Sequence, residues 1–358
     1  FSGTKLKWLL DNVKGARAKA DAGELAFGTI DSGFVYKLTG HTAHVTDVSN
    51  ASRTLLMNLR TLEWDPAMLT MLDVPRSVLP RIGASAEQYG VTRGLKSLPD
   101  GIPVSGMAGD QQAALFGQAC FTPGEAKCTY GTGAFLLMNI GNQPLASRSG
   151  LLTTVGWKLN GETTYALEGS SFIAGAAVQW LRDGLQLIKH SADVEALAKT
   201  VKSTGDVVFV PALAGLGAPH WRPDARGLFA GMDRGTTRGH LARAVLEGVA
   251  LQLQDLADAM KLDSGRDIPA FKVDGGAARN GLLMQFQADI LDTNVVRPKN
   301  VETTSLGAAF LGGLGVGFWK SPDEIRRAWK ADRVFKPKMS AGERARHLGK
   351  WREAVKRA

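Results

Sequence analysis

One acidic residue of the chain stands where a side chain could do chemistry. The stretch MAGDQQAALFG, Met107–Gly117, places Asp110 and Gln111 between a glycine and an apolar run. Two interpretations of Asp110 are open. Its carboxylate can cap a helix by accepting hydrogen bonds from the free N–H groups of the first turn. It can instead act as a general base at the mouth of a cleft and take a proton from a substrate hydroxyl.

Two glycine-rich turns have the composition of anion-binding loops. YGTGAF, residues 130–135, indicates a turn between two strands, where glycines let N–H groups converge on an anion and the Thr132 hydroxyl adds a donor. A plain tight hairpin turn is the alternative. VDGGAARNG, residues 273–281, indicates a strand that runs through Gly275 and Gly276 into a helix, whose N-terminus favours negative charge. Neither turn has the Rossmann or P-loop spacing, so we do not expect those folds.

A third stretch adds a small residue and an amide on one helical face. In FIAGAAVQW, Gly175 and Gln179 are four residues apart, so Gly175 leaves space and Gln179 can reach a hydroxyl. Helix packing through a small residue is the alternative. Each signal alone is weak, and the information lies in their order along the chain: an acid, a glycine hairpin and two glycine-lined helix starts.

The elements that must position these residues alternate between helical and strand patterns, which is typical of an α/β fold. The expected helices cover residues 3–13, 65–74, 171–185, 236–262, 278–291, 303–319 and 340–358. The expected strands cover residues 25–30, 126–130, 134–140, 151–159, 162–169, 207–213, 270–276 and 294–298. Between two of these strands, Asn160 followed by Gly161 is a strong hairpin signal.

The order of these elements predicts two domains that meet at Asp110. After about residue 114 the chain opens with strands and then alternates helices with strands, an order that builds a mixed sheet with helices on its faces. We therefore expect a boundary at residues 109–114, with one domain at 1–113 and a second at 114–358. Ligands often bind in clefts between domains, so this boundary favours the general-base interpretation of Asp110.

Length and composition fit a globular protein with large cores. The 358 residues are 44% hydrophobic and 22% charged, and no apolar run reaches the length of a membrane span. No secretory leader is present, so we expect a cytoplasmic protein. Cys120 and Cys128 have no metal or redox spacing, and the histidines are scattered along the chain. We therefore expect two buried thiols in a reducing compartment and no structural zinc.

The net charge of +9 is concentrated in one segment. Residues 320–358 hold 13 Lys or Arg against 5 Asp or Glu, a local balance of +8. We expect a helix there with a basic, solvent-facing side. A nucleic-acid site would call for interleaved aromatic residues or a recognisable module, and because neither is found we expect no nucleic-acid partner.

Several stretches together resemble the FGGY family of carbohydrate kinases. GLFAGM, followed after seven residues by HLARAVLE, is similar to one family signature, and SGTKLKW is similar to the body of another. The resemblance extends from residue 1 to the end of the chain through VTDVSNASRT, AGDQQAALFG, TYGTG, LEGS, AGAAVQWLRDG, GLGAP, VDGGA and LGAAFLGGLGVGFW. The QQAALFG run after Asp110 is similar to that of the members that phosphorylate glycerol, rather than a pentose or a hexonate.

The resemblance implies an actin-like ATPase fold, in which two ribonuclease H-like domains close over ATP and glycerol. Residues 1–113 would be the C-terminal part of the first domain, on the substrate side, and residues 114–358 the second domain, on the nucleotide side. The implied reaction is the ATP-dependent phosphorylation of glycerol to sn-glycerol 3-phosphate. The chain begins with Phe1 in what reads as the middle of a helical region. We therefore expect it to lack an N-terminal segment that carries a phosphate loop, metal-linked acid and glycerol contacts, and assign activity to the complete protein.

The same resemblance implies a role for each candidate site residue. Asp110 would be the general base, accepting the proton of a glycerol hydroxyl as its oxygen attacks the γ-phosphorus of ATP, with Mg²⁺ nearby. Gln111 and Phe135 would line the glycerol pocket, and Thr132 would contact the terminal phosphates. The residues expected to hold ribose and adenine are Gly175, Gln179, Gly276 and Asn280. We also expect a homo-oligomer.

Two other functions stay open on the sequence. The protein could phosphorylate another polyol or a sugar. It could also be a non-catalytic actin-like scaffold, against which the position of Asp110 beside the phosphate turn argues. The chain departs from the usual family pattern at Ser32, Gly33, Cys128, Ala134, His220, Arg222, Asp224, Arg279 and Gly281.

Overall fold

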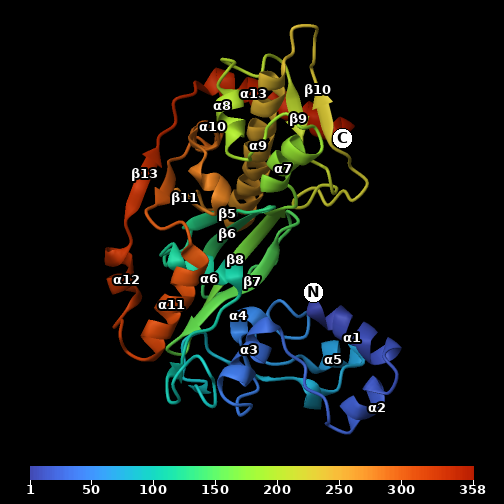
Figure 1. The fold of residues 1–358 in the computed structure, drawn as a ribbon, viewed down its shortest axis with the longest axis vertical. Coiled ribbons are helices and arrows are strands. Elements are labelled where there is room, and N and C mark those ends of the chain that lie inside the picture. The colour runs from blue at the N-terminus through green and yellow to red at the C-terminus, as the bar shows by residue number, and fades with distance from the viewer.

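The computed structural model describes residues 1–358 as two lobes stacked along the long axis of the molecule (Figure 1). The lower lobe, residues 1–104, consists of short helices and short strands around a small core. Its helices are α1 (Ser2–Asn12), α2 (Ala16–Asp21), α3 (Ile30–Leu38), α4 (Val48–Ala51), α5 (Pro66–Leu72) and the 3-10 helix η1 (Arg76–Val78). Its strands are β1 (Val45–Asp47), β2 (Arg81–Gly83), β3 (Gly90–Val91) and β4 (Pro103–Val104).

The upper lobe, residues 110–358, is organised around a seven-stranded sheet. From edge to edge its strands are β13 (Ala331–Phe335), β12 (Val295–Pro298), β11 (Phe271–Asp274), β5 (Ala126–Tyr130), β6 (Ala134–Gly141), β8 (Glu162–Ser171) and β7 (Leu152–Leu159). β11 pairs parallel with both β5 and β12, whereas the other neighbours are antiparallel. A separate two-stranded sheet joins β9 (Val208–Val210) and β10 (Leu228–Ala230).

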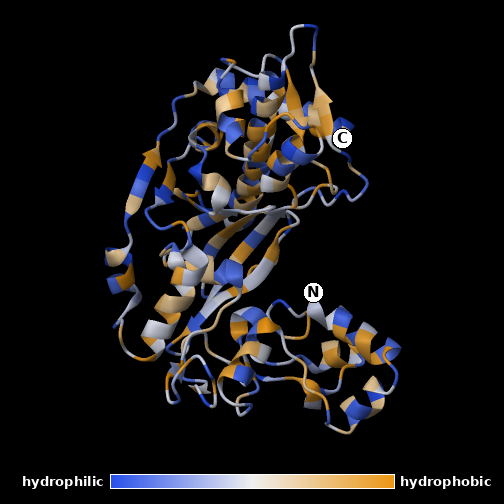
Figure 2. Ribbon diagram, viewed as in Figure 1, coloured by the Kyte–Doolittle hydropathy of each residue, from blue (hydrophilic) through white to orange (hydrophobic).

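Helices cover both faces of the large sheet, and hydrophobic residues recur in the strands and in the helices beside them (Figure 2). The helices of the upper lobe are α6 (Asp110–Gly117), α7 (Gly175–Asp183), α8 (Asp193–Ala198), α9 (Arg238–Ser264), η2 (Gly276–Arg279), α10 (Gly281–Leu291), α11 (Thr303–Gly315), α12 (Pro322–Ala328) and α13 (Ala341–Arg357). Alternate residues of a strand point to opposite faces. Ala126, Cys128 and Tyr130 of β5 accordingly join the large core that includes α9, while Lys127 and Thr129 face α6.

Small residues let α6 and α11 approach each other closely. A Cβ atom on Gly307 would lie 1.8 Å from the carbonyl oxygen of Ala113, and one on Gly117 would lie 2.1 Å from the carbonyl oxygen of Thr303. The side chains around this contact, among them Phe116 and Phe310, form a separate core on that face of the sheet. The helix expected at residues 303–319 is therefore confirmed as α11, although it ends at Gly315, and it supports the helix that begins with Asp110.

Most of the expected elements are confirmed, and the exceptions have local reasons. Asn160 and Gly161 both have positive φ at the β7–β8 turn, and Asp65 caps α5 with Pro66 at its first position. The strand expected at residues 25–30 is wrong: no strand forms there, and α3 begins at Ile30. The helix expected at 171–185 begins only at Gly175, because β8 continues to Ser171.

The C-terminal helix α13 is confirmed and is fastened to the loop that precedes β10. Two departures from the family pattern make these contacts. The Arg222 guanidinium donates to the carbonyl oxygens of Val355 and Ala358, at 2.9 and 3.1 Å. His220 Nε2 lies 2.9 Å from an oxygen of Asp255, which also accepts from the Trp351 indole. The basic helix is thus held by specific side chains of the upper lobe.

Both cysteines of the chain are buried in the upper lobe and neither forms a disulfide, as expected. Burial raises the pKa of the Cys120 thiol and that of the Cys128 thiol above the usual value for cysteine. No helix of the structure combines the length and the hydropathy needed to cross a bilayer.

Candidate functional site

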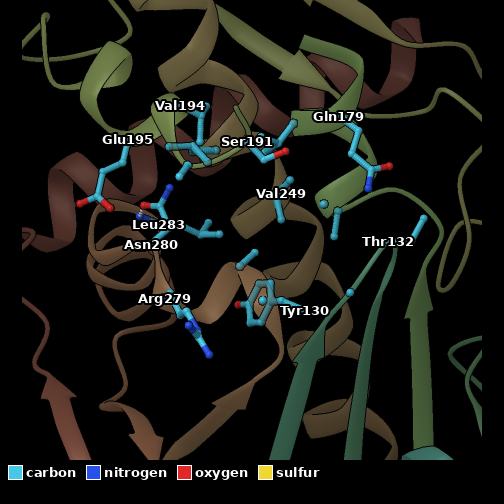
Figure 3. A pocket seen from close by; sticks show the side chains of 18 residues that line it. Tyr130, Thr132, Gln179, Ser191, Val194, Glu195, Val249, Arg279, Asn280 and Leu283 are labelled. Atoms are coloured by element: carbon cyan, nitrogen blue, oxygen red, sulfur yellow. Dashed lines mark hydrogen bonds between the residues drawn. The ribbon is translucent and has the colours of Figure 1, made fainter. Parts of the chain in front are cut away.

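A pocket of about 440 Å³ opens in the upper lobe where the β5–β6 turn, α7, α9 and α10 meet (Figure 3). All five residues that the sequence predicts as nucleotide contacts line it: Thr132, Gly175, Gln179, Gly276 and Asn280. They come from segments as far apart as residues 132 and 280, so the fold brings together what the sequence separates.

Backbone contacts explain why glycine is needed around this pocket. Gly175 N–H donates to the carbonyl oxygen of Gly131 at 2.9 Å, and a Cβ atom on Gly175 would lie 2.6 Å from that oxygen. Gly275 has φ +83°, and a Cβ there would lie 2.5 Å from the carbonyl oxygen of Tyr130. Side chains at either position would push the turn away from its neighbours. The turn is a tight hairpin, as the alternative interpretation holds, and it also lines the pocket at Thr132.

Asn280 lines the pocket and also caps the helix that follows it. Its side-chain oxygen accepts from Leu283 N–H at 2.9 Å and so caps α10. The helix expected from residue 278 therefore begins later, after the short 3-10 turn η2. Because the cap uses the amide oxygen, the amide N–H groups of Asn280 stay available to a ligand.

The sequence analysis missed most of the apolar walls and one polar edge of the pocket. The additional lining residues include Tyr130, Val178, Ser191, Val194, Glu195, Leu246, Val249, Arg279 and Leu283. Glu195, in α8, accepts from Gly281 N–H at 3.2 Å, which ties α8 to the start of α10. The apolar walls suit a flat ring, and the polar residues suit its edges and substituents.

Asp110 lies outside this pocket, at the first position of α6, where it is exposed. The N-cap of α6 is Gly109, so the interpretation of Asp110 as the helix cap is wrong. One carboxylate oxygen accepts from Gln111 N–H at 2.8 Å, and the other lies 3.3 Å from Gln111 Nε2. A carboxylate in the first turn is favoured by the helix dipole and here remains open to a ligand.

A buried hydrogen-bond network of the lower lobe holds the start of α6. Gly109 N–H donates to Ser49 Oγ at 2.9 Å, and Ser49 Oγ donates to Asp47 at 2.9 Å. Asp47 is fully buried and also accepts from Ser85 Oγ at 2.7 Å and from Asn50 N–H. Burial raises the pKa of the Asp47 carboxyl, and these hydrogen bonds act in the opposite direction. VTDVSN was part of the resemblance, but the sequence assigned it no role.

Gln111 and Phe135, the other two residues expected at a substrate site, lie on the α6 side of the sheet. Gln111 is half-buried, and its Oε1 accepts from Lys127 Nζ at 2.6 Å. Phe135 is half-buried and stands opposite Thr129 in the β5–β6 pairing. The strand β5 thus connects the two groups of predicted residues, because it runs from Lys127 and Thr129 into the turn at Thr132.

Comparison with known proteins agrees with this arrangement. The N-terminal domain model of the FGGY family of carbohydrate kinases matches residues 1–117, and the C-terminal domain model matches residues 126–316. A glycerol kinase of Myxococcus xanthus is 72% identical over 100% of this chain and 73% of its own length. A glycerol kinase of Deinococcus radiodurans is 58% identical over 100% of this chain and 71% of its own length.

Solved structures show the same fold. A Plasmodium falciparum glycerol kinase with ADP superposes with a TM-score of 0.93 at 41% identity, covering 100% of this chain and 71% of that one. A xylulose kinase from Lactobacillus acidophilus gives a TM-score of 0.84 at 24% identity, covering 99% and 71%. The expected actin-like ATPase fold is therefore confirmed. With both domain models matched and close relatives along its whole length, the chain belongs to the FGGY family of carbohydrate kinases.

Proposed function

We propose that the protein catalyses the ATP-dependent phosphorylation of glycerol to sn-glycerol 3-phosphate. The relatives named glycerol kinase support this choice of substrate, and the similar structure with ADP supports the choice of nucleotide. The observation that carries the proposal is the convergence of five expected nucleotide contacts on one pocket, with an exposed carboxylate at the start of α6.

The nucleotide is proposed to occupy the pocket of the upper lobe. Val249 and Leu283 would contact the faces of adenine, while the Gln179 and Asn280 amides would bind the ribose or the edge of the base. The terminal phosphates would lie at the β5–β6 turn, where the exposed Thr132 hydroxyl is a donor. This orientation directs the γ-phosphoryl group out of the apolar part of the pocket.

Asp110 is proposed as the general base of the transfer. Its carboxylate accepts the proton of a glycerol hydroxyl while that oxygen forms a bond to the γ-phosphorus, and the bond from phosphorus to the β–γ bridging oxygen breaks to release ADP. Gln111 and Phe135 flank the acceptor, one through its amide and one through its ring. Phosphoryl transfer depends mostly on positioning and charge neutralisation. The hydrogen bond of Gly109 to Ser49 and the close packing of α6 on α11 provide such positioning for Asp110.

A magnesium ion fits the donor chemistry beside Asp110. Mg²⁺ prefers carboxylate and phosphate oxygens, and the exposed carboxylate of Asp110 offers such oxygens to a metal–nucleotide complex. The ion would neutralise charge on the phosphates when bound. Assembly into a homo-oligomer and a cytoplasmic location remain predictions.

A substrate panel tests the proposed function. ADP release by the complete protein is coupled to a spectrophotometric readout with glycerol, propane-1,2-diol, erythritol, xylulose and gluconate as acceptors. We expect the highest kcat/KM with glycerol, because an analogue that lacks a hydroxyl leaves the polar groups that bind that hydroxyl without a partner. A higher value for a sugar would assign the protein to another substrate class, and no turnover with any acceptor would favour a scaffold.

A further inference from the structure

A lysine is buried beneath the proposed substrate site. Lys127, in β5, is fully buried, and its ammonium donates to Gln111 Oε1 at 2.6 Å and to Thr129 Oγ1 at 2.7 Å. Burial lowers the pKa of Lys127, and the nearby Asp274 carboxylate acts in the opposite direction. Burying an ammonium group is costly unless it is well paired. Such a group therefore calls for an explanation.

The contacts of Lys127 differ from those of a structural ion pair. Its two hydrogen-bond acceptors are neutral, and none of the carboxylates whose charges act on it accepts a hydrogen bond from it. Asp274 accepts from Gln118 Nε2 at 2.8 Å and from Thr303 Oγ1 at 2.7 Å. Glu168 accepts from Arg53 at 2.8 Å through Oε1, and its buried Oε2 has no hydrogen-bond partner. The ammonium group thus donates to the side chain of Gln111 and forms no salt bridge.

The contact with Lys127 fixes which end of the Gln111 amide faces the proposed substrate site. An ammonium group has donors and no acceptor, so it can bind only the amide oxygen of Gln111. The amide nitrogen is then turned toward Asp110, whose carboxylate lies 3.3 Å away. Gln111 and Asp110 consequently present one donor and one acceptor side by side. An alcohol oxygen can satisfy both, since it accepts from an N–H group and donates its own proton.

We propose that Lys127 is a positioning residue that orients the Gln111 amide to donate to a substrate hydroxyl. This inference rests on the proposed function, because it takes Asp110 and Gln111 as the groups that meet the acceptor alcohol. Lys127 does not touch the substrate in this arrangement. Its effect should therefore pass entirely through Gln111, which a double-mutant cycle can measure.

The cycle compares Lys127→Met in the wild-type protein and in a Gln111→Ala background. Methionine keeps most of the volume of lysine and removes the ammonium group. We expect Lys127→Met to raise the KM for glycerol about tenfold while the KM for ATP stays within about twofold, because one hydrogen bond to the acceptor loses its orientation. In the Gln111→Ala background the same substitution should change the KM for glycerol by less than about twofold. Equal changes in both backgrounds would overturn the proposal.

Lys272 supplies a matched control from the neighbouring strand. It pairs with Lys127 across the β5–β11 ladder and is largely buried, and its ammonium donates to the carbonyl oxygens of Gln118 and Ala119 at 2.9 and 3.2 Å. Lys272→Met should leave the KM for glycerol unchanged. A rise as large as that of Lys127→Met would mean that loss of any buried lysine has this effect, and the proposal would fail.

A second variant keeps the test decisive if Lys127→Met does not fold. Gln111→Glu retains a partner for the ammonium group but replaces the amide donor by an acceptor. We expect the KM for glycerol to rise at least about tenfold in this variant, with folding preserved. A KM close to that of the wild type would show that no donor is needed there.

The substrate panel separates this inference from the proposed function. If the wild-type protein prefers another polyol or sugar, the choice of glycerol is wrong, and the cycle is repeated with the preferred acceptor. Non-additivity between Lys127 and Gln111 would then still support the positioning role, whereas additive effects would refute it.

Discussion

The carboxylate of Asp110 has few hydrogen-bond partners in the protein and is open to a substrate, which suits a general base. Its hydrogen-bond partners in the protein belong to Gln111, and the side chain is exposed. We expect Asp110→Asn to lower kcat by roughly 10² to 10⁴, the usual effect of removing a positioned general base, with little change in ADP affinity. Steady-state kinetics and calorimetry with ADP measure the two quantities.

Asp65→Asn is the matched control for this substitution. Asp65 caps α5 in the lower lobe by accepting from Ala67 and Met68 N–H groups, and asparagine is an equally good cap. Its kcat should equal that of the wild type. If Asp110→Asn also retained most of its turnover, Asp110 would be a favourable charge in the first turn of α6 and not a base.

Glu247 gives the protein a predictable dependence of stability on pH. It is buried in α9, where Arg243 Nε lies 2.9 Å from one oxygen and His347 Nδ1 of α13 lies 3.9 Å from the other. Burial raises the pKa of Glu247 from 4.5 to about 7, and Arg243 acts in the opposite direction. Between these values the folded state binds more protons than the unfolded state, so the free energy of unfolding falls as the pH rises, by at most about 3 kcal/mol.

Urea unfolding of the wild type and of Glu247→Gln at pH 5 and pH 8 isolates this contribution. Glutamine mimics the protonated acid, so the variant should gain stability relative to the wild type as the pH rises. His347 titrates in both proteins, and burial lowers its pKa, which gives a slope of opposite sign that cancels in the comparison. A constant difference between the two proteins would show that Glu247 does not carry the effect.

At the scale of elements, α6 and α11 are in contact through backbone atoms. A Cβ on Gly307 would lie 1.8 Å from the carbonyl oxygen of Ala113, so Gly307→Ala should separate the two helices and lower the free energy of unfolding by about 3 kcal/mol. Because α6 carries Asp110, kcat should fall as well. Thermal unfolding and steady-state kinetics test both expectations.

Gly312 lies in the same helix and controls for helix propensity. The nearest atoms to a Cβ there are 3.9 Å away, which is an ordinary contact. Gly312→Ala should be neutral or stabilise by up to about 1 kcal/mol, since alanine favours helix more than glycine. Equal losses at both glycines would mean that close packing is not the cause.

Local sequence patterns predicted the elements where local interactions determine them. The β7–β8 turn needs two residues with positive φ, and the sequence Asn160 followed by Gly161 predicts such a turn. The apolar run at residues 25–30 looks like a strand, but a strand needs a neighbour to pair with. Phe27 finds only single partners there, Val78 for its N–H and His44 for its carbonyl oxygen.

The residues of the candidate site also fall into two groups: those that a local sequence pattern predicts and those that only the packing of the elements brings together. Glycine turns are visible in the sequence because close backbone approach demands a particular residue type, and so Thr132, Gly175 and Gly276 were found. Leu246 and Val249 reach the pocket only because α9 packs beside α7, which no local pattern reveals. The contact between Lys127 and Gln111 likewise depends on how α6 lies on β5.

At the scale of the whole molecule, side-chain contacts connect the two lobes in addition to the covalent chain. Val155 and Tyr165 of the β7–β8 hairpin belong to the core of the lower lobe, and Tyr165 OH donates to the carbonyl oxygen of Leu59 at 2.6 Å. In the other direction, Ser49 of the lower lobe holds Gly109 at the start of α6. The position of Asp110 therefore depends on both lobes.

Ser49→Ala tests this dependence. The substitution leaves the buried Gly109 N–H without its acceptor, which should cost about 1–3 kcal/mol of stability. It should also lower kcat about tenfold, because the proposed base is less well positioned, while ADP affinity is unchanged. Kinetics, calorimetry and thermal unfolding provide the three measurements.

Thr54→Val is the control for a lost hydroxyl acceptor. Thr54 is buried in the lower lobe, and its Oγ1 accepts from Leu56 N–H at 3.0 Å, without a contact to α6. Its stability should fall by a similar amount with kcat unchanged. A similar loss of kcat in both variants would attribute the effect to general loosening of the lower lobe.

Within these 358 residues both cysteines are buried, so neither should compete with an introduced cysteine for a labelling reagent. Thiolates are the reactive form of cysteine, and burial disfavours them at both Cys120 and Cys128. Cysteines introduced at Met71 in the lower lobe and at Met232 in the upper lobe, where the native side chains are 72% and 57% exposed, would be the sites that accept a maleimide dye. Energy transfer between the two dyes would then report the separation of the lobes as nucleotide and glycerol are added, without removal of Cys120 or Cys128.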